Sequence, residues 1–390
     1  MQTDARNRAQ AASKRLDSWL REQAYPLWAD VGFDASSGRF VEKIALDGTA
    51  VDLPSRGRVP PRQIYAFSVA PEFGWTGDAR GIVRKGLEAY LASHQRPDKL
   101  FRPVAGPTAD GADAEKVELY DQAFALFGLA AAHPWWDGGL ERAAVAVRLA
   151  IRRRLSHPAG GFRSAWPPRL LESNPHMHML EACLAWAALS PDPAWPAMAQ
   201  EIIDLARERF IDPDSGALRE FFTDDWRPAD GVAGRVVEPG HQYEWAWLLL
   251  RWAHQAGDAR LKQMALRLIE VAESHGVDPR RGVAVDELLD DLTVHRATAR
   301  LWPQTERIKA GSLAANLTGQ DSYWNMAAAA AEALEGYLRT PVDGLWRDVL
   351  LPTGEFAEEP APASSLYHIV VALSVLREEL QTSDRLVRPL

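Results

Sequence analysis

The sequence has only one cysteine, Cys183, among its 390 residues. A single thiol excludes an intramolecular disulfide and any zinc site built from several cysteines. No run of 18 uninterrupted apolar residues occurs, so no membrane-spanning helix is expected. The first ten residues are polar and carry both signs of charge, unlike a secretory signal. We therefore expect a cytoplasmic protein with no membrane partner.

Positively charged residues are outnumbered by negatively charged ones. The chain has 44 Lys and Arg against 53 Asp and Glu, a formal net charge of −9. This balance argues against nucleic-acid binding, which needs a basic face. Gly-rich phosphate loops and His-Glu-x-x-His zinc motifs are missing too, so we expect neither a cofactor nor a metal. The abundant residue is tryptophan, with 15 copies, whose ring stacks on sugars and equally fills protein cores.

A short turn signature recurs along the chain: polar residues with Pro or Asp, usually a Gly, then an apolar or aromatic residue. Gly and Asp suit tight turns, and the residues after them are predicted to form brief strands. Six copies follow one another at intervals of roughly 55 to 66 residues: Asp34–Phe40, Arg96–Phe101, Pro158–Phe162, Asp212–Leu218, Asp278–Val283 and Pro341–Trp346.

Segments with helical periodicity lie between these turns. Amphipathic segments such as 138–154 alternate with segments such as 240–255 that are apolar nearly all round, which indicates outer and inner helices. We predict one all-α domain over 1–390, an (α/α)6 barrel of six helical hairpins with short β-hairpin loops. An open solenoid is less favoured because no polar capping repeats are visible. The predicted helices are 8–24, 61–72, 79–93, 118–132, 138–154, 175–189, 195–209, 240–255, 259–274, 302–316, 322–337 and 364–379.

Polar side chains gather at the N-terminal ends of the predicted inner helices. If these helices run parallel, the polar groups meet at one mouth of the barrel, a convergence that favours a binding pocket. His241 and His368 are the candidate catalytic residues. The candidate substrate-binding residues are Arg62, Tyr120, Asn174, His178, Glu181, Arg235, Glu244, Trp302 and Glu306.

Each of these residues also has an ordinary structural explanation. His241 and Glu244 lie three apart and can form a local hydrogen bond on one helix face. Arg62 can neutralise a buried carboxylate, and Trp302 can be core packing. His176 is expected to be structural because it points away from the face that His178 shares with Asn174.

Three kinds of chemistry compete for this set. His178, His241, Glu244 and His368 are potential metal ligands, although no metal-binding motif joins them. Glycoside hydrolysis would use two opposed carboxylates from the same helix ends. Imidazole suits abstraction of the acidic hydrogen at C2 of an open-chain aldose, because its pKa lies near neutrality. Returning the proton to C1 of the enediolate gives a ketose, whereas returning it to the opposite face of C2 gives the 2-epimer.

The quoted residues fall into motifs by which the chain resembles the N-acylglucosamine 2-epimerase superfamily. The resemblance spans nearly the whole chain and implies a metal-free (α/α)6 barrel that reacts through an enediolate. It also implies that His241 and His368 are the acid/base pair and that Arg62, Asn174, His178, Glu244 and Glu306 bind or orient the sugar. The motifs are Arg62-x-x-Tyr65-x-Phe67, Tyr120-Asp121-x-Ala123-Phe124, Asn174-x-x-x-His178-x-x-Glu181-Ala182, Pro239-Gly240-His241-x-x-Glu244-Trp245, Trp302-Pro303-Gln304-x-Glu306 and Tyr367-His368.

Within this superfamily, the segments around His241 and Trp302 look most like aldose–ketose isomerases of the mannose type. We therefore expect interconversion of free D-mannose and D-fructose. A sugar 2-epimerase is the alternative, and a glycoside hydrolase is less favoured. A catalytically silent barrel that binds a sugar or a partner is a further possibility. A phosphosugar ranks lower because only Arg62, Arg235 and Arg307 are candidate cations for the pocket. We expect a monosaccharide as the partner and a monomer or homodimer as the assembly.

Overall fold

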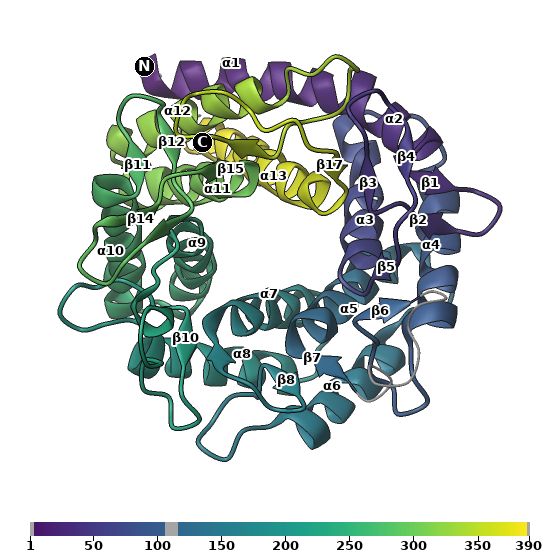
Figure 1. The fold of residues 1–390 in the computed structure, drawn as a ribbon, viewed down its shortest axis with the longest axis horizontal. Helices are drawn as coiled ribbons and strands as arrows, with labels where there is room; N and C mark the ends of the chain where they lie inside the picture. The colour runs from purple at the N-terminus through teal and green to yellow at the C-terminus, as the bar shows by residue number, and fades with distance from the viewer. Residues whose placement is uncertain (1–3, 106–115, 388–390) are drawn as a thin grey trace.

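The structure is a computed structural model that describes residues 4–105 and 116–387. Its helices form two concentric layers around a central axis (Figure 1). Inner helices contact one another in chain order, and the last of them, α13, contacts the first, α3, so that the inner layer closes. The inner helices are α3 (Val59–Ser68), α5 (Leu119–Ala132), α7 (Ser173–Leu189), α9 (Pro239–Ala256), α11 (Leu301–Thr318) and α13 (Ser364–Val387).

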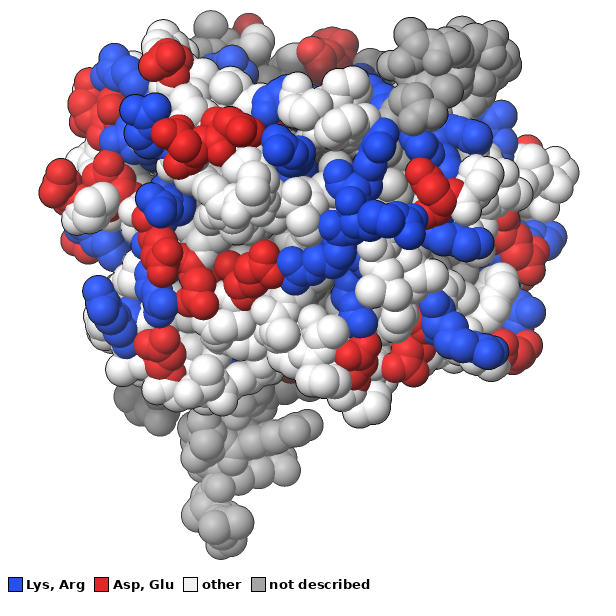
Figure 2. All heavy atoms as spheres, turned by 90° about the horizontal axis from the view of Figure 1, so that it is seen from below, with Lys and Arg blue, Asp and Glu red and all other residues white. Residues whose placement is uncertain are grey.

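The outer layer consists of helices that bury one side only. In α10, for example, Leu261, Ala265, Leu268 and Ala272 are buried, a spacing that forms one stripe of the helix. Charged side chains of both signs cover the outside, as the side of the barrel near α6 and α8 shows (Figure 2). The outer helices are α1 (Asp4–Trp19), α4 (Ala79–His94), α6 (Glu141–Leu155), α8 (Ala194–Leu205), α10 (Ala259–His275) and α12 (Asp321–Tyr337).

Each predicted helical segment is occupied by a helix, and three of them differ in detail. The predicted helix 61–72 is divided into α3, which ends at Ser68, and a 3-10 helix over Ala70–Phe73. α1 continues as a π-helical turn over Leu20–Ala24 before α2 (Tyr25–Asp30), and α8 continues as another over Ala206–Phe210. A π turn inserts one residue into the helical ladder and so changes the direction of the faces beyond it. Hydrophobic periodicity does not reveal such an insertion. Among the described residues, no helix combines the length and apolarity needed to cross a membrane.

Five of the six recurrent turns form short antiparallel pairings, and among the described residues the sixth, Pro341–Trp346, forms a turn without a strand pairing. Two of them are hairpins, Asp34–Arg39 and Asp278–Val283, and three others are single bridges. Glycines in these turns have positive φ, such as 72° at Gly38 and 73° at Gly216. The second copy has no glycine, and there Lys99 adopts φ of 75°. The turn geometry is thus kept even where the residue that favours it is absent.

Side chains in the first turns of the inner helices fasten these turns to the barrel. Gln122 accepts a hydrogen bond from Phe101 N at 2.8 Å and donates to Phe101 O at 3.0 Å. Gln242 and Gln304 bond in the same way to Leu218 and Ala284. At the matching place His176 accepts from Phe162 N at 3.1 Å, so its predicted structural role agrees with the geometry. Because these side chains bond the turns to the inner helices, they are not available to a ligand.

Short strands lie where the chain enters the inner helices. One sheet joins the N-terminal and C-terminal parts of the barrel. In this sheet β3 (Lys43–Ile44) pairs with both β4 (Ala50–Val51) and β17 (Ala361–Pro362). β5 (Ser55–Arg56) pairs with β6 (Val104–Ala105) directly before α3. The remaining strands are β1 (Phe33–Asp34), β2 (Arg39–Phe40), β7 (Val117–Glu118), β8 (Ala165–Trp166), β9 (Leu171–Glu172), β10 (Phe221–Phe222), β11 (Val277–Asp278), β12 (Val283–Ala284), β13 (Glu287–Leu288), β14 (Val294–Arg296), β15 (Ala299–Arg300) and β16 (Val349–Leu350).

Candidate active site

A cavity of about 340 Å³ opens at the N-terminal ends of the inner helices. Every inner helix contributes at least one side chain to it, so the helices do run parallel and their polar ends do converge. This volume is in the range of small-molecule sites. The predicted residues that line the cavity are Arg62, Tyr120, Asn174, His178, His241, Glu244, Trp302 and His368.

His241, in the first turn of α9, is paired with carboxylates. Its Nδ1 lies 3.0 Å from Glu220 Oε2 and 3.7 Å from Glu238 Oε2. Burial opposes the charged imidazolium, but the two carboxylates outweigh burial and raise the pKa of His241 to about 10. His241 is therefore protonated at neutral pH. Glu220 is itself buried and accepts a hydrogen bond from the Ser173 hydroxyl at 2.9 Å, which fixes its position.

His368, in the second turn of α13, has the opposite charge state. Its Nδ1 lies 2.9 Å from Glu306 Oε1. Burial, together with the positive charges of Arg62 and Lys309, holds the pKa of His368 well below its usual value. The imidazole is neutral at neutral pH, and its Nε2 is free to accept a proton when Nδ1 donates to Glu306. The indole of Trp302 lies between the two histidines, with ring centroids 5.0 Å from His241 and 5.7 Å from His368.

A lysine that sequence reasoning missed lies beneath the two histidines. Lys309 is completely buried, and its Nζ contacts Glu306 Oε2 and lies 3.9 Å from Glu244 Oε1. It also lies 4.1 Å from the centre of the Trp247 ring. Burial works against the ammonium, yet the carboxylates raise the pKa of Lys309, so it stays charged. The spacing of Lys309 three residues after Glu306 was the signal in the sequence.

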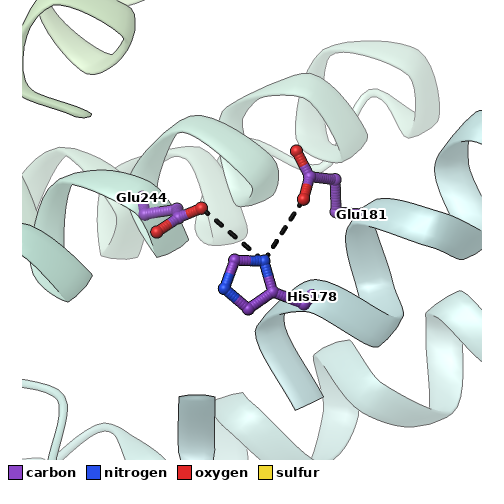
Figure 3. A group of neighbouring side chains, drawn as sticks. All are labelled: His178, Glu181 and Glu244. Atoms are coloured by element: carbon purple, nitrogen blue, oxygen red, sulfur yellow. Dashed lines mark hydrogen bonds and ion pairs between the residues drawn. The ribbon is translucent and has the colours of Figure 1, made fainter. Parts of the chain in front are cut away.

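His178, which lines the cavity, is surrounded by a group of polar side chains (Figure 3). His178 Nδ1 lies 3.3 Å from Glu181 Oε2 and 3.9 Å from Glu244 Oε1. The Tyr367 hydroxyl donates to Glu181 at 2.5 Å. Burial alone would raise the pKa of Glu181, but the hydrogen bond from His178 and the charge of Lys309 lower it to about 2. Glu181 therefore supports His178 from below and does not line the cavity.

Arg62 reaches the cavity from α3. One of its guanidinium nitrogens donates to the Tyr120 hydroxyl at 2.5 Å, and its Cζ lies 3.9 Å above the centre of the Phe124 ring. Among the described residues no carboxylate lies within 4 Å of it, so neither Glu306 nor Asp121 neutralises it as the structural explanation required. Asp121 pairs instead with Arg58, at 3.3 Å. Arg62 is thus a buried cation that faces the cavity.

Two predicted cations lie elsewhere. Arg235 is part of a short 3-10 helix outside the cavity, 42% exposed, and forms ion pairs with Asp290 at 2.8 Å and Asp291 at 3.0 Å. The loop before α9 turns this side chain away from His241, so sequence proximity misled the prediction. Arg307 points to the outer layer and pairs with Glu273 at 2.6 Å. Neither residue contacts the pocket.

Other cations, which sequence reasoning missed, do line the cavity. They are Lys43, Arg56, Arg58 and Arg300. All four come from strands or from residues just before a helix, where no helical periodicity marks their direction. The sequence-based reason for ranking a phosphosugar low, a shortage of cations at the pocket, therefore does not hold.

Within residues 4–105 and 116–387, three groups of side chains bring potential metal ligands within 4.8 Å of one another: His178, Glu181 and Glu244; Glu220, Glu238 and His241; and Glu244, Glu306 and His368. In each group the carboxylates already face a cation or donor of the protein. Glu306 and Glu244 face the Lys309 ammonium, and Glu220 and Glu238 face the His241 imidazolium. The donor sets are thus organised as ion pairs within the protein.

Comparison with known proteins agrees with this architecture. The structure superposes on a D-mannose isomerase with a TM-score of 0.82 at 19% identity, covering 95% of this chain and 97% of the other. It matches the cellobiose 2-epimerase of Spirochaeta thermophila DSM 6192 with a TM-score of 0.82 at 21% identity, over 98% and 100% of the two chains. The helical barrel is therefore the fold of these proteins.

Sequence relatives give the class. A protein of Rhizobium meliloti (strain 1021) named mannose-6-phosphate isomerase is 44% identical over 94% of this chain and 97% of its own length. A D-mannose isomerase of Thermobifida fusca is 26% identical over 86% and 89%. The fold, the paired imidazoles and these relatives define an enzyme that acts on sugars. The chain belongs to the N-acylglucosamine 2-epimerase family, whose model matches residues 38–372.

Proposed function

We propose that the chain is an aldose–ketose isomerase that interconverts D-mannose and D-fructose by proton transfer through a cis-enediolate. The observation that carries this proposal is the difference in charge between two imidazoles facing one cavity. His368 is neutral and serves as the base, while His241 is protonated and serves as the acid. A relative named mannose-6-phosphate isomerase and another named D-mannose isomerase support the choice of a sugar isomerase.

In the proposed reaction, His241 gives its proton to the ring oxygen as the bond between that oxygen and C1 breaks. The neutral imidazole then takes the proton of the O1 hydroxyl, so that the open-chain aldehyde forms and His241 is charged again. The Nε2 atom of His368 then removes the hydrogen at C2. The electron pair left at C2 forms the C1–C2 double bond of the enediolate, and negative charge moves to O1. His241 protonates O1 and takes up the proton of the O2 hydroxyl as the C2 carbonyl forms. His368, whose imidazolium exchanges its proton with solvent, delivers a proton to C1, which gives the ketose. Atoms and charge balance without an external oxidant or reductant.

Other residues stabilise and orient the reacting sugar in this proposal. Arg62, a cation with no carboxylate beside it, stabilises the enediolate oxygens electrostatically. Asn174 carries a buried side-chain oxygen that has no hydrogen-bond partner among the described residues, and so can accept from a sugar hydroxyl. Glu244 and His178 offer further polar atoms to the hydroxyls. Glu306 holds the base in its reactive orientation, a positioning role.

A sugar 2-epimerase is the second candidate, favoured by relatives such as the cellobiose 2-epimerase of Bacteroides fragilis, which is 27% identical over 71% of this chain and 75% of its own length. Epimerisation delivers a proton to the opposite face of C2 and, in reverse, removes one from that face. His241 would have to act as a base in one direction. With a pKa of about 10, it is deprotonated in roughly one molecule in a thousand at pH 7. This penalty favours isomerisation by His368 alone.

The test is incubation of the purified protein with D-mannose in D₂O, with and without a metal chelator, followed by NMR. Fructose deuterated at C1 supports the isomerase, and glucose deuterated at C2 with little ketose supports the epimerase. Release of reducing ends from oligosaccharides without exchange would support a hydrolase. His368→Asn should abolish turnover, whereas His254→Asn, an exposed position on α9, is the matched control. Full activity of His368→Asn would contradict the mechanism.

A further inference from the structure

One side of the cavity is built from cationic side chains. Lys43 on β3, Arg56 on β5, Arg58 just before α3 and Arg62 within α3 all line the same cavity as the two histidines, and we name these four residues the basic wall. Lys43 pairs in the sheet with Pro362, just before α13, whose first residue Ser364 also lines the cavity. The basic wall is thus continuous with the N-terminal end of the helix that carries His368.

The outer members of the basic wall lie nearer to solvent than the histidines. The side chains of Arg56 and Arg58 are 40% and 33% exposed, whereas those of His241 and His368 are 6% and 9% exposed. A sugar with C1 and C2 between the histidines has C6 at its far end. The exposure gradient therefore places C6 at the outer part of the cavity, which Arg56 and Arg58 line together with Glu359 and Pro360.

Buried carboxylates hold two of these cations in place. Arg56 Nε donates to Glu42 Oε2 at 2.6 Å, and Arg58 Nε lies 3.3 Å from Asp121 Oδ1. Glu42 is 2% exposed and Asp121 is 0% exposed. A guanidinium has five N–H donors, so each arginine keeps donors for a ligand after pairing. Anchoring of this kind orients the guanidinium groups before any ligand arrives.

Two cations of the basic wall, Lys43 and Arg62, form no ion pair with a carboxylate among the described residues. Within the described residues, no carboxylate lies within 4 Å of Lys43, although Glu359 occurs two residues before β17 on the neighbouring strand segment. Arg62 also lacks a carboxylate partner, as shown above. Arg56 and Arg58 are thus paired with Glu42 and Asp121, whereas Lys43 and Arg62 are not, although Glu359 and Asp348 also line the cavity. A neutral hydroxymethyl group would leave Lys43 without an ion-pair partner.

We propose that Lys43, Arg56 and Arg58 of the basic wall bind a phosphate monoester at C6, so that the preferred substrates are hexose 6-phosphates. Arg62, the buried member of the wall, stays at the enediolate oxygens. Guanidinium groups match phosphate oxygens by paired hydrogen bonds, and Lys43 adds a point charge. This inference rests on the proposed isomerase function, because the position of C6 is deduced from the histidines. A carboxylate at C6, as in a uronate, carries one charge fewer and is an alternative that the experiment separates.

The test compares kcat/KM for D-mannose, D-mannose 6-phosphate and D-mannuronate in the full-length protein. We expect the phosphate ester to be preferred over mannose by at least about tenfold, since one charge-assisted hydrogen bond has roughly that effect. Lys43→Met removes a cation without leaving a carboxylate unpaired, and it should reduce this preference about tenfold. Lys14→Met, at an exposed position of α1, is the matched control and should not change the preference.

Equal kcat/KM for mannose and its 6-phosphate, unchanged in Lys43→Met, would overturn the phosphate assignment while the isomerase proposal stands. A preference for mannuronate would overturn it in favour of a carboxylate ligand. Calorimetric titration with D-fructose 6-phosphate and with inorganic phosphate covers the remaining case. If the protein turns over no sugar but binds these ligands, and Lys43→Met weakens that binding, the anion site is supported and only the isomerase function is refuted. If the protein does not bind them, the anion site is refuted.

Discussion

Replacing Lys309 by methionine should destabilise the protein in a way that grows with pH. The change keeps an unbranched side chain but removes the only ammonium beside Glu306 and Glu244 among the described residues. Removing one partner of a buried ion pair costs about 3–5 kcal/mol when the other charge remains. Here the pKa of each glutamate is already raised to about 7, by burial above all, so protonation offers a partial escape. We therefore expect a loss near the lower limit, about 3 kcal/mol, at pH 6.

The pH dependence follows from the direction of these shifts. In the folded chain the pKa of Glu306 lies above the ordinary value of 4.5, so ionising it costs folding free energy as pH rises from about 4.5 to 7. Without Lys309 the pKa of Glu306 rises further, so the pH range in which its ionisation lowers the free energy of unfolding extends above pH 7. The difference in unfolding free energy between wild type and Lys309→Met should then widen by about 1.4 kcal/mol per pH unit for each carboxyl that must ionise.

The assay is denaturant unfolding followed by tryptophan fluorescence at pH 6, 7 and 8. Lys262→Met is the matched control, because that ammonium donates only to the backbone carbonyl of Leu317 at the surface of the barrel. A second readout is kcat, which should fall because neutral Glu306 holds His368 less firmly. A loss below about 1 kcal/mol that is the same at all three pH values would refute the reasoning.

Three further changes test the charge states of the site. Glu220→Gln removes a carboxylate from His241, so the alkaline limb of the kcat profile, expected near pH 10 in the wild type, should move toward neutral pH; an unmoved limb would show that another group controls it. Arg62→Met should lower kcat about 10²- to 10³-fold, the usual loss for a group that stabilises an oxyanion, and a change in KM alone would assign it to binding. Arg235→Ala should leave kcat/KM within about twofold of wild type, since this side chain lies outside the cavity, and a larger loss would return it to the site.

The helices could be predicted from the sequence because the hydrophobic pattern of each one lies within its own residues. In α10 the apolar residues recur along one stripe, and in α9 they surround the helix, so layer and burial follow from local periodicity alone. The convergence of the helix ends was also predictable, since parallel inner helices place equivalent residues at one mouth. Arg62, His241 and His368 were predicted in this way to share one pocket, and all three line the cavity.

The tertiary structure decided everything that depends on strands, loops and through-space charge. Lys43 and Glu220 belong to short extended segments whose direction no period fixes, and Arg235 was misplaced for the same reason. Gln304 belongs to the same sequence motif as Trp302 and Glu306, but its hydrogen bonds to Ala284 show that its role is structural. Above all, two histidines that are chemically identical in the sequence acquire opposite protonation states. His241 meets Glu220 across the fold, whereas His368 lies near Arg62 and Lys309, and only folding brings those charges together.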